Sequence, residues 1–220
     1  MKPESAVSVL LLLAGCSALA PAEKAFHRFE DAHFPASTAL AFDQQASVLA
    51  SGGLAGDLAL WRVSPPKEIT RFAAHKGAVR ALHFADRDTL VSAGKDGKLL
   101  LWQAPWKAPI AAAQNSSVTS MSADSERVVT GHEDGWIRVW ALPSLALIES
   151  RQLAGAVRSL ALDREMIAVG TDAGRVALLG FKLELLRELE KSPWSPRDLR
   201  FSPDGKWLAA GMWFRIQVWE

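Results

Sequence analysis

The histidines and the single cysteine are the side chains of this chain best suited to metal binding or catalysis. The histidines are His27, His33, His75, His83 and His132, and no two of them have the spacing of metal ligands on one helix. Cys16 has no second cysteine to work with, which excludes zinc–thiolate sites and covalent haem attachment. The chain also lacks a P-loop, a GxSxG motif and a dinucleotide-binding glycine motif. We therefore predict no catalytic residue, no metal site and no cofactor.

Cys16 suits a different chemistry, the attachment of lipid. It follows a short polar start and nine mostly apolar residues at 6–14 (AVSVLLLLA), too few to span a bilayer. That pattern is typical of a secretory signal peptide. The sequence Leu13-Ala14-Gly15-Cys16 resembles the lipoprotein box of bacteria, which implies acylation of Cys16 and cleavage of the chain just before it. The alternative is a plain signal peptide with an incidental cysteine.

These features divide the chain into three parts. We expect a lipoprotein signal peptide at 1–15, the lipidated Cys16 and a short tether at 16–24, and a folded domain at 25–220. The resemblance implies export and anchoring in a bacterial membrane facing the periplasm, and Ser17 favours the outer membrane. With its only cysteine acylated, the domain would have no disulfide to stabilise it.

A segment of eleven residues recurs five times and indicates the elements of this domain. Its copies begin at residues 51, 92, 130, 169 and 209, and close on Trp61, Trp102, Trp140, Leu179 and Trp219. Each copy has small residues, then a turn, then alternating apolar residues, as in two strands joined by a tight turn. Another strand-like run precedes each copy, and a third lies before that, at 25–30, 67–72, 107–113, 145–152 and 182–189. About four strands per forty residues predicts an all-β propeller of five four-stranded blades.

The resemblance to the WD-repeat family covers about 25–220. In that family a histidine between blades, a serine or threonine, a turn aspartate and the closing tryptophan form a buried hydrogen-bonded tetrad. The second repeat matches fully, with His75, Ser92, Asp96 and Trp102. The third keeps Thr130, Asp134 and Trp140 but has Gln114 at the histidine position, and we interpret His132 as a surface-loop residue. The first keeps His33, Ser51 and Trp61, with Ala55 at the aspartate position; the last two repeats have lost most of the tetrad.

The five repeats allow two arrangements. A closed ring, in which residues 25–30 complete the last blade, would remove the exposed sheet edges, and we favour it. An open arc, either shortened or completed by another chain, is the alternative.

One position of the repeat is rich in arginine. The residue after the start of the innermost strand is Thr38, Arg80, Thr119, Arg158 or Arg197, and a closed ring would gather these at one mouth of the channel. The family resemblance implies that this position and the one before the turn aspartate face binding partners. The candidate partner-binding face is therefore Arg80, Arg158, Arg197, Lys95 and Trp213. Arginines beside an exposed aromatic ring are typical of interface anchors, whereas a solvated charged rim is the simpler interpretation.

The composition limits the function classes. The chain has 220 residues, 49% of them hydrophobic, and a net charge of +1, so it has material for a large core and no general attraction to nucleic acid. We predict a non-enzymatic scaffold or accessory subunit, lipid-anchored in the bacterial cell envelope, that binds a protein partner on one face. The alternative is a small-molecule-binding, anion-binding or hydrolytic propeller that uses the channel mouth.

Overall fold

The computed structural model describes residues 29, 32–113, 116–189 and 191–220, and every regular element among them is a β-strand. Nineteen strands form five antiparallel sheets, each made of strands consecutive in the chain. The expected all-β class and the five repeats are thus confirmed. The signal peptide, Cys16 and the tether lie outside the described residues.

Each sheet is one blade, and its strands run outwards from the centre in chain order. The first blade holds β1 (Ser37–Phe42), β2 (Val48–Gly53), β3 (Asp57–Arg62) and β4 (Lys67–Ala73). The second holds β5 (Val79–Phe84), β6 (Thr89–Gly94), β7 (Lys98–Gln103) and β8 (Ile110–Ala113). The third holds β9 (Val118–Ala123), β10 (Arg127–His132), β11 (Trp136–Ala141) and β12 (Leu147–Gln152). The fourth holds β13 (Val157–Leu162), β14 (Ile167–Thr171), β15 (Val176–Leu179) and β16 (Leu185–Glu188), and the fifth holds β17 (Asp198–Phe201), β18 (Leu208–Gly211) and β19 (Ile216–Trp219).

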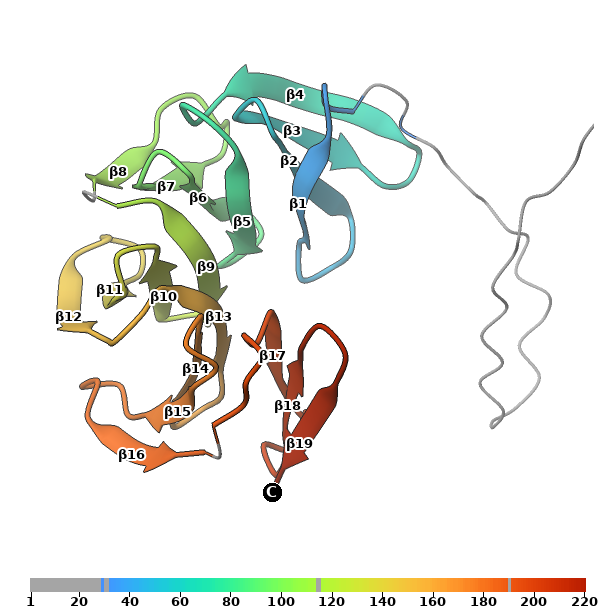
Figure 1. Ribbon diagram of the computed structural model, residues 1–220. Coiled ribbons are helices and arrows are strands. Elements are labelled where there is room, and N and C mark those ends of the chain that lie inside the picture. The colour runs from blue at the N-terminus through green and yellow to red at the C-terminus, as the bar shows by residue number, and fades with distance from the viewer. Residues whose placement is uncertain (1–28, 30–31, 114–115, 190) are drawn as a thin grey trace, which may run out of the picture.

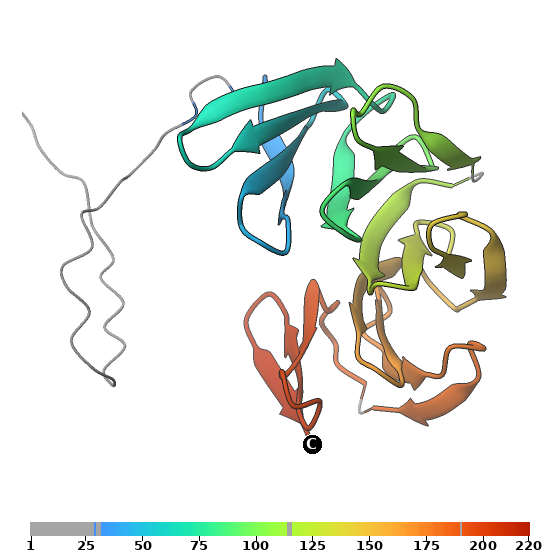
Figure 2. The same ribbon diagram turned by 180° about the vertical axis from the view of Figure 1, so that it is seen from behind.

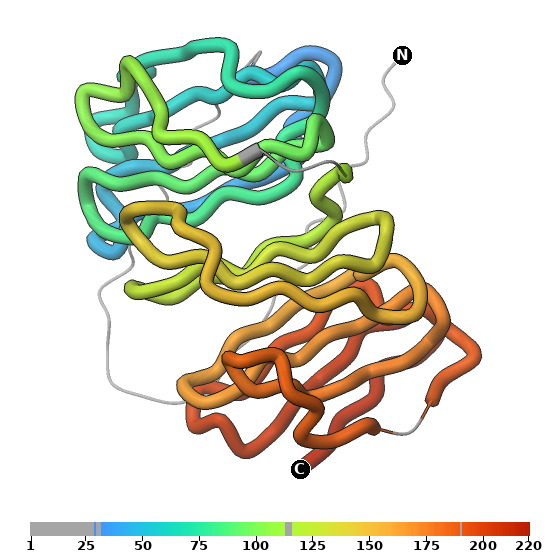
Figure 3. Tube along the Cα trace, turned by 90° about the vertical axis from the view of Figure 1, so that its left-hand side faces the viewer, coloured from blue at the N-terminus to red at the C-terminus, as the bar shows by residue number. Residues whose placement is uncertain are grey.

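Apolar side chains between neighbouring blades form the core. Between the first two blades, Leu58 and Leu60 of β3 pack in one cluster with Phe84 of β5 and Trp102 of β7. Both faces of a middle blade are covered in this way, which explains why the central strands are apolar on both faces rather than on one. The innermost strands contact one another in the order β1, β5, β9, β13, β17. Figures 1 and 2 show the blades following this order around an incomplete ring, and Figure 3 shows the same succession from the side.

The closed ring that the sequence favours is not formed, and the structure is an open arc. No contact comparable to those between neighbouring innermost strands joins β17 to β1. The fifth blade has three strands, and residues 25–28 and 30, which were expected to supply its fourth, lie outside the described residues. The free face of the fifth blade is consequently uncovered, whereas Phe29 lies on Trp61 at the first blade with ring centres 4.6 Å apart. Ile216 of β19 is 78% exposed, whereas Leu99, at the matching place in β7, is fully buried.

The fifth repeat also differs from the expected alignment by one residue. Leu208 pairs with Trp219, just as Leu49 pairs with Trp61 in the first blade. Ala210, rather than Ala209, therefore takes the place of Ser51. The segment from Ala210 to Trp219 is one residue shorter than the segment from Ser51 to Trp61, so the five copies do not have equal length.

Candidate functional site

The second blade contains the complete hydrogen-bonded tetrad that the sequence predicts. The His75 ring lies between Asp96 and Ser92, with Nδ1–Oδ1 and Nε2–Oγ distances of 2.9 and 2.8 Å. The Trp102 indole donates to the same Ser92 oxygen over 2.9 Å. Burial lowers the pKa of His75, which favours a neutral ring. A neutral ring protonated on Nδ1 donates to Asp96 and accepts the Ser92 hydroxyl proton, so each buried group has a partner.

The first blade has a full tetrad as well, with an acid that the sequence alignment missed. His33 Nδ1 lies 2.5 Å from Asp57 Oδ2, and its Nε2 lies 2.7 Å from Ser51 Oγ, which also accepts from Trp61 over 2.7 Å. The expectation that Ala55 leaves this blade without an acid is therefore wrong. Asp57 begins β3, just after the turn, and from there its side chain reaches the histidine.

The third blade replaces the loop histidine with one from its own strand. His132 is fully buried at the end of β10, with Nε2 3.0 Å from Thr130 Oγ1, which also accepts from Trp140 over 3.0 Å. Its assignment to a surface loop was wrong. Gln114 lies outside the described residues, and Asp134 accepts from the Trp136 backbone N–H within its own turn. The matching residue is glycine in the first two blades, so His132 was a visible departure in the sequence.

The arginine position of the repeat faces one central cavity. This cavity has a volume of about 470 Å³ and is lined by residues from or next to all five innermost strands. Arg80, Arg158 and Arg197 are all among its lining residues, and each is exposed. Although the ring is open, it brings the three arginines to one mouth, as the sequence predicts.

The two threonines at the same repeat position have a different role. Thr38 donates its hydroxyl hydrogen bond to the Val79 carbonyl over 2.6 Å, and Thr119 donates to the Val157 carbonyl over 2.5 Å. Each bond links an innermost strand to the next one. Threonines at this position thus link the first blade to the second and the third blade to the fourth, whereas the second, fourth and fifth blades have arginine there.

Aromatic residues extend the mouth on the fifth blade. The Arg197 guanidinium lies 3.7 Å from the centre of the Trp213 ring, and Arg158 lies 3.7 Å from Asp172. Trp194 packs edge-on against Phe214 with ring centres 5.4 Å apart, and both rings are exposed. The sequence did not point to these two residues, because Trp194 lies outside the repeated segments and Phe214 stands in the turn of the fifth copy, which does not match the other turns. Lys95 lies in the β6–β7 turn at the same end, outside the cavity lining.

A scan against family models matches the WD domain, G-beta repeat family at residues 66–103, 109–141 and 184–220. These segments include most of the second, third and fifth blades. The chain is a WD-repeat protein.

Relatives and solved structures agree with this family. The human Angio-associated migratory cell protein is 29% identical over 50% of this chain and 26% of its own length. Mitochondrial division protein 1 of Kluyveromyces lactis is 28% identical over 51% of this chain and 18% of its own length. The crystal structure of the RRP9 WD40 repeats has a TM-score of 0.74 at 25% identity, and covers 82% of this chain and 61% of that one. The computationally designed Ika8 protein has a TM-score of 0.75 at 25% identity, with 86% and 59% covered.

This WD-repeat chain thus spans a third or less of the curated relatives that it matches. WD-repeat proteins generally bind other proteins and are generally not enzymes. Within the described residues, histidine, cysteine and acidic side chains form no group of three that could hold a metal ion. The described part of the chain also contains no helix long and apolar enough to cross a membrane.

The buried His132 should make stability depend on pH. Burial lowers its pKa to about 4, from 6.5. Below pH 6.5 the unfolded chain therefore binds a proton that the folded chain excludes, and stability falls until the pH reaches about 4. We expect a loss on the order of 2–3 kcal/mol over this range, and a His132→Gln variant should lose less. Urea denaturation at a series of pH values measures both. If the free energy of unfolding falls with pH equally in the original protein and in His132→Gln, His132 is not buried in its neutral form.

Proposed function

We propose that this WD-repeat protein is a non-enzymatic scaffold that binds a protein partner at the channel mouth. The observation that carries the proposal is the gathering of Arg80, Arg158 and Arg197 around one cavity. Of the acidic groups there, Asp172 lies near Arg158 and Asp198 is part of the lining. Glu133 lies in the β10–β11 turn at the same end. Counted with Lys95, the three arginines outnumber these three acids, so an acidic surface of a partner would complement the mouth.

The exposed aromatic rings beside the arginines strengthen this proposal. Trp194, Trp213 and Phe214 are between 39% and 81% exposed, and they adjoin Arg197 through its contact with Trp213. Tryptophan and arginine are enriched among residues that dominate binding energy at protein interfaces. A partner covering both groups would combine apolar burial with charge pairing.

We further propose that Cys16 anchors the scaffold to a bacterial membrane, with the outer membrane favoured. The support is the sequence pattern at residues 6–16, which resembles a lipoprotein signal ending in the only cysteine. The mouth would then present its arginines to an envelope protein on the periplasmic side. The neutral overall charge gives no support for nucleic acid as a partner.

Replacing Arg80, Arg158 and Arg197 together by serine should leave the fold intact, because all three side chains are exposed. Partner capture should fall at least about tenfold, since several charge-pairing contacts are removed at once. The measurement is the yield of photo-crosslinked partner from a crosslinking residue placed at Lys95, in the cells that produce the protein.

The matched control removes the same charge from the opposite end of the blades. Arg87, Arg164 and Lys206 are exposed in the turns that follow the innermost strands, and the triple serine variant there should crosslink as the original protein does. Equal crosslinking by both triple variants would place the interface elsewhere.

A further inference from the structure

The fourth blade has lost every large member of the tetrad. Its closing residue is Leu179, which pairs with Ile167 just as Trp102 pairs with Leu90. Val169 stands where Ser92 stands in the second blade, and Leu153 stands where His75 does. The indole and imidazole that fill this place in the first three blades are both missing.

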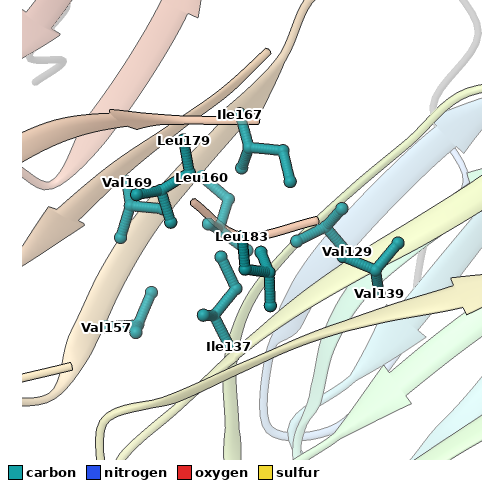
Figure 4. Close-up of a cluster of buried hydrophobic side chains, with 9 residues drawn as sticks. All are labelled: Val129, Ile137, Val139, Val157, Leu160, Ile167, Val169, Leu179 and Leu183. Carbon is teal, nitrogen blue, oxygen red and sulfur yellow. The ribbon is translucent and has the colours of Figure 1, made fainter. Parts of the chain in front are cut away.

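A cavity of about 200 Å³ occupies the vacated place. It lies between the outer strand β12 of the third blade and the face of the fourth blade, and its lining includes Leu153, Val169, Ala177 and Leu179. Figure 4 shows Val169 and Leu179 in the cluster of apolar side chains between these blades. In the second blade the same space is full, since a Cβ on Gly94 would lie 2.3 Å from His75 Nδ1.

One polar group in the cavity wall has no partner. Thr171 is only 4% exposed, and its hydroxyl oxygen is buried without a hydrogen bond. An unpaired buried hydroxyl costs roughly 1–3 kcal/mol relative to a paired one. The oxygen is closed to solvent, so a ligand in the cavity would bond to it after the Thr171 side chain turns, and that bond would recover the cost.

We propose that this cavity binds an aromatic ring of about indole size that carries one hydrogen-bonding group. Leu153, Val169, Ala177 and Leu179 give the cavity an apolar wall, and a smaller engineered apolar cavity of about 150 Å³ is known to bind benzene. The first three blades fill the equivalent place with an indole, which shows what shape the blade geometry accepts.

Arg151 favours an aromatic ring over an aliphatic ligand. It lines the cavity at the position where Phe72, in the first blade, packs on Trp102 with ring centres 4.6 Å apart. The Arg151 guanidinium donates to the Leu183 carbonyl over 2.6 Å, which fixes it at the rim. Arginine stacks readily on aromatic faces, as Arg71 does over Trp61 at 5.3 Å.

Such a ring has two sources, a free aromatic molecule or a tryptophan or tyrosine side chain of a partner. The cavity shares no lining residue with the channel mouth, so this site is independent of the proposed scaffold function. The exposed pair of Arg175 and Glu188, 3.2 Å apart, flanks the opening and would meet whatever the ring is attached to.

The test uses fluoroindole as the probe, followed by fluorine NMR and by calorimetry on the chain from residue 17. We expect saturable binding with half-saturation at about 0.1–1 mM, the range for a ligand of so few atoms. Leu179→Trp, which restores the family side chain, should weaken binding at least tenfold. Ala177→Leu, a smaller change in the same wall, should do the same if the first variant does not fold.

Three further arms complete the test. Leu186→Trp adds an exposed indole on the same strand as Leu185, outside the lining, and should leave binding unchanged. Thr171→Val should weaken the binding of fluoroindole more than the binding of benzene. A short peptide with one tryptophan that displaces fluoroindole would identify a partner side chain as the ligand, whereas no displacement would identify a free molecule. Absence of binding up to the solubility of fluoroindole, or equal binding by Leu179→Trp, would overturn the proposal.

Discussion

Replacing Trp102 by alanine should lower the free energy of unfolding by about 3–5 kcal/mol, the usual cost of truncating a buried tryptophan. Trp102 is 4% exposed, packs on Phe72 of the neighbouring blade, and donates to Ser92. The substitution removes apolar contacts between two blades and leaves Ser92 with one hydrogen bond fewer. Urea denaturation followed by circular dichroism measures the change.

Trp207→Ala is the matched control for that experiment. Trp207 is 46% exposed. It belongs neither to the apolar cluster that contains Trp102 nor to the cluster of the fifth blade. Its loss should cost less than about 1 kcal/mol, as is usual for surface positions. Similar midpoints for the two variants would contradict the assignment of Trp102 to a stabilising tetrad.

Replacing Cys16 by alanine should transfer the protein from the membrane fraction to the soluble fraction. Only a cysteine thiol can form the thioether that carries the diacylglycerol of a bacterial lipoprotein. Durable anchoring needs more than one acyl chain, and a lipoprotein cysteine carries enough of them. Fractionation of a bacterial host, with intact mass spectrometry of the purified protein, measures both location and acylation.

Ser17→Ala is the control for this variant, because it keeps the thiol and should remain membrane-bound and acylated. The lipid proposal fails if the original protein carries no acyl mass, or if Cys16→Ala stays in the membrane fraction.

The sequence predicts the strands well and the tetrads in part. Strand positions follow from alternation and turn residues, which act locally, and the second tetrad follows from a full motif match. Asp57 and His132 could not be assigned, because a strand residue can reach the same space between blades that a loop or turn residue reaches in the second blade. A sequence motif expects each tetrad side chain at one fixed position of the repeat. The structure shows that a strand residue such as His132 fills that space between blades equally well.

The aromatic residues at the mouth and the cavity of the fourth blade escaped sequence analysis for a related reason. Trp194 lies in the connection before β17, outside the repeated segment, and Phe214 lies in the turn of the fifth copy, where the sequence does not match the other turns. The cavity arises because the fourth blade lacks the tryptophan and histidine of the tetrad, and a missing side chain leaves no motif to find. In the sequence, Leu179 alone indicates only a degenerate repeat. The cavity can be recognised only when Arg151 and Thr171, from two other strands, are seen to line it with Leu179.

The open arc has a consequence for how the molecule loses its structure. Each blade is stabilised through the neighbours on either side, and the two end blades have one neighbour each in the described structure. A linear array of this kind can fray from its ends while its middle stays folded. The third blade, flanked by two blades on each side, would be the last to exchange its amide hydrogens. The turn that holds Trp213 and Phe214 is on an end blade and would be among the first parts to unfold. The proposed partner would bind this least stable part of the array and stabilise it.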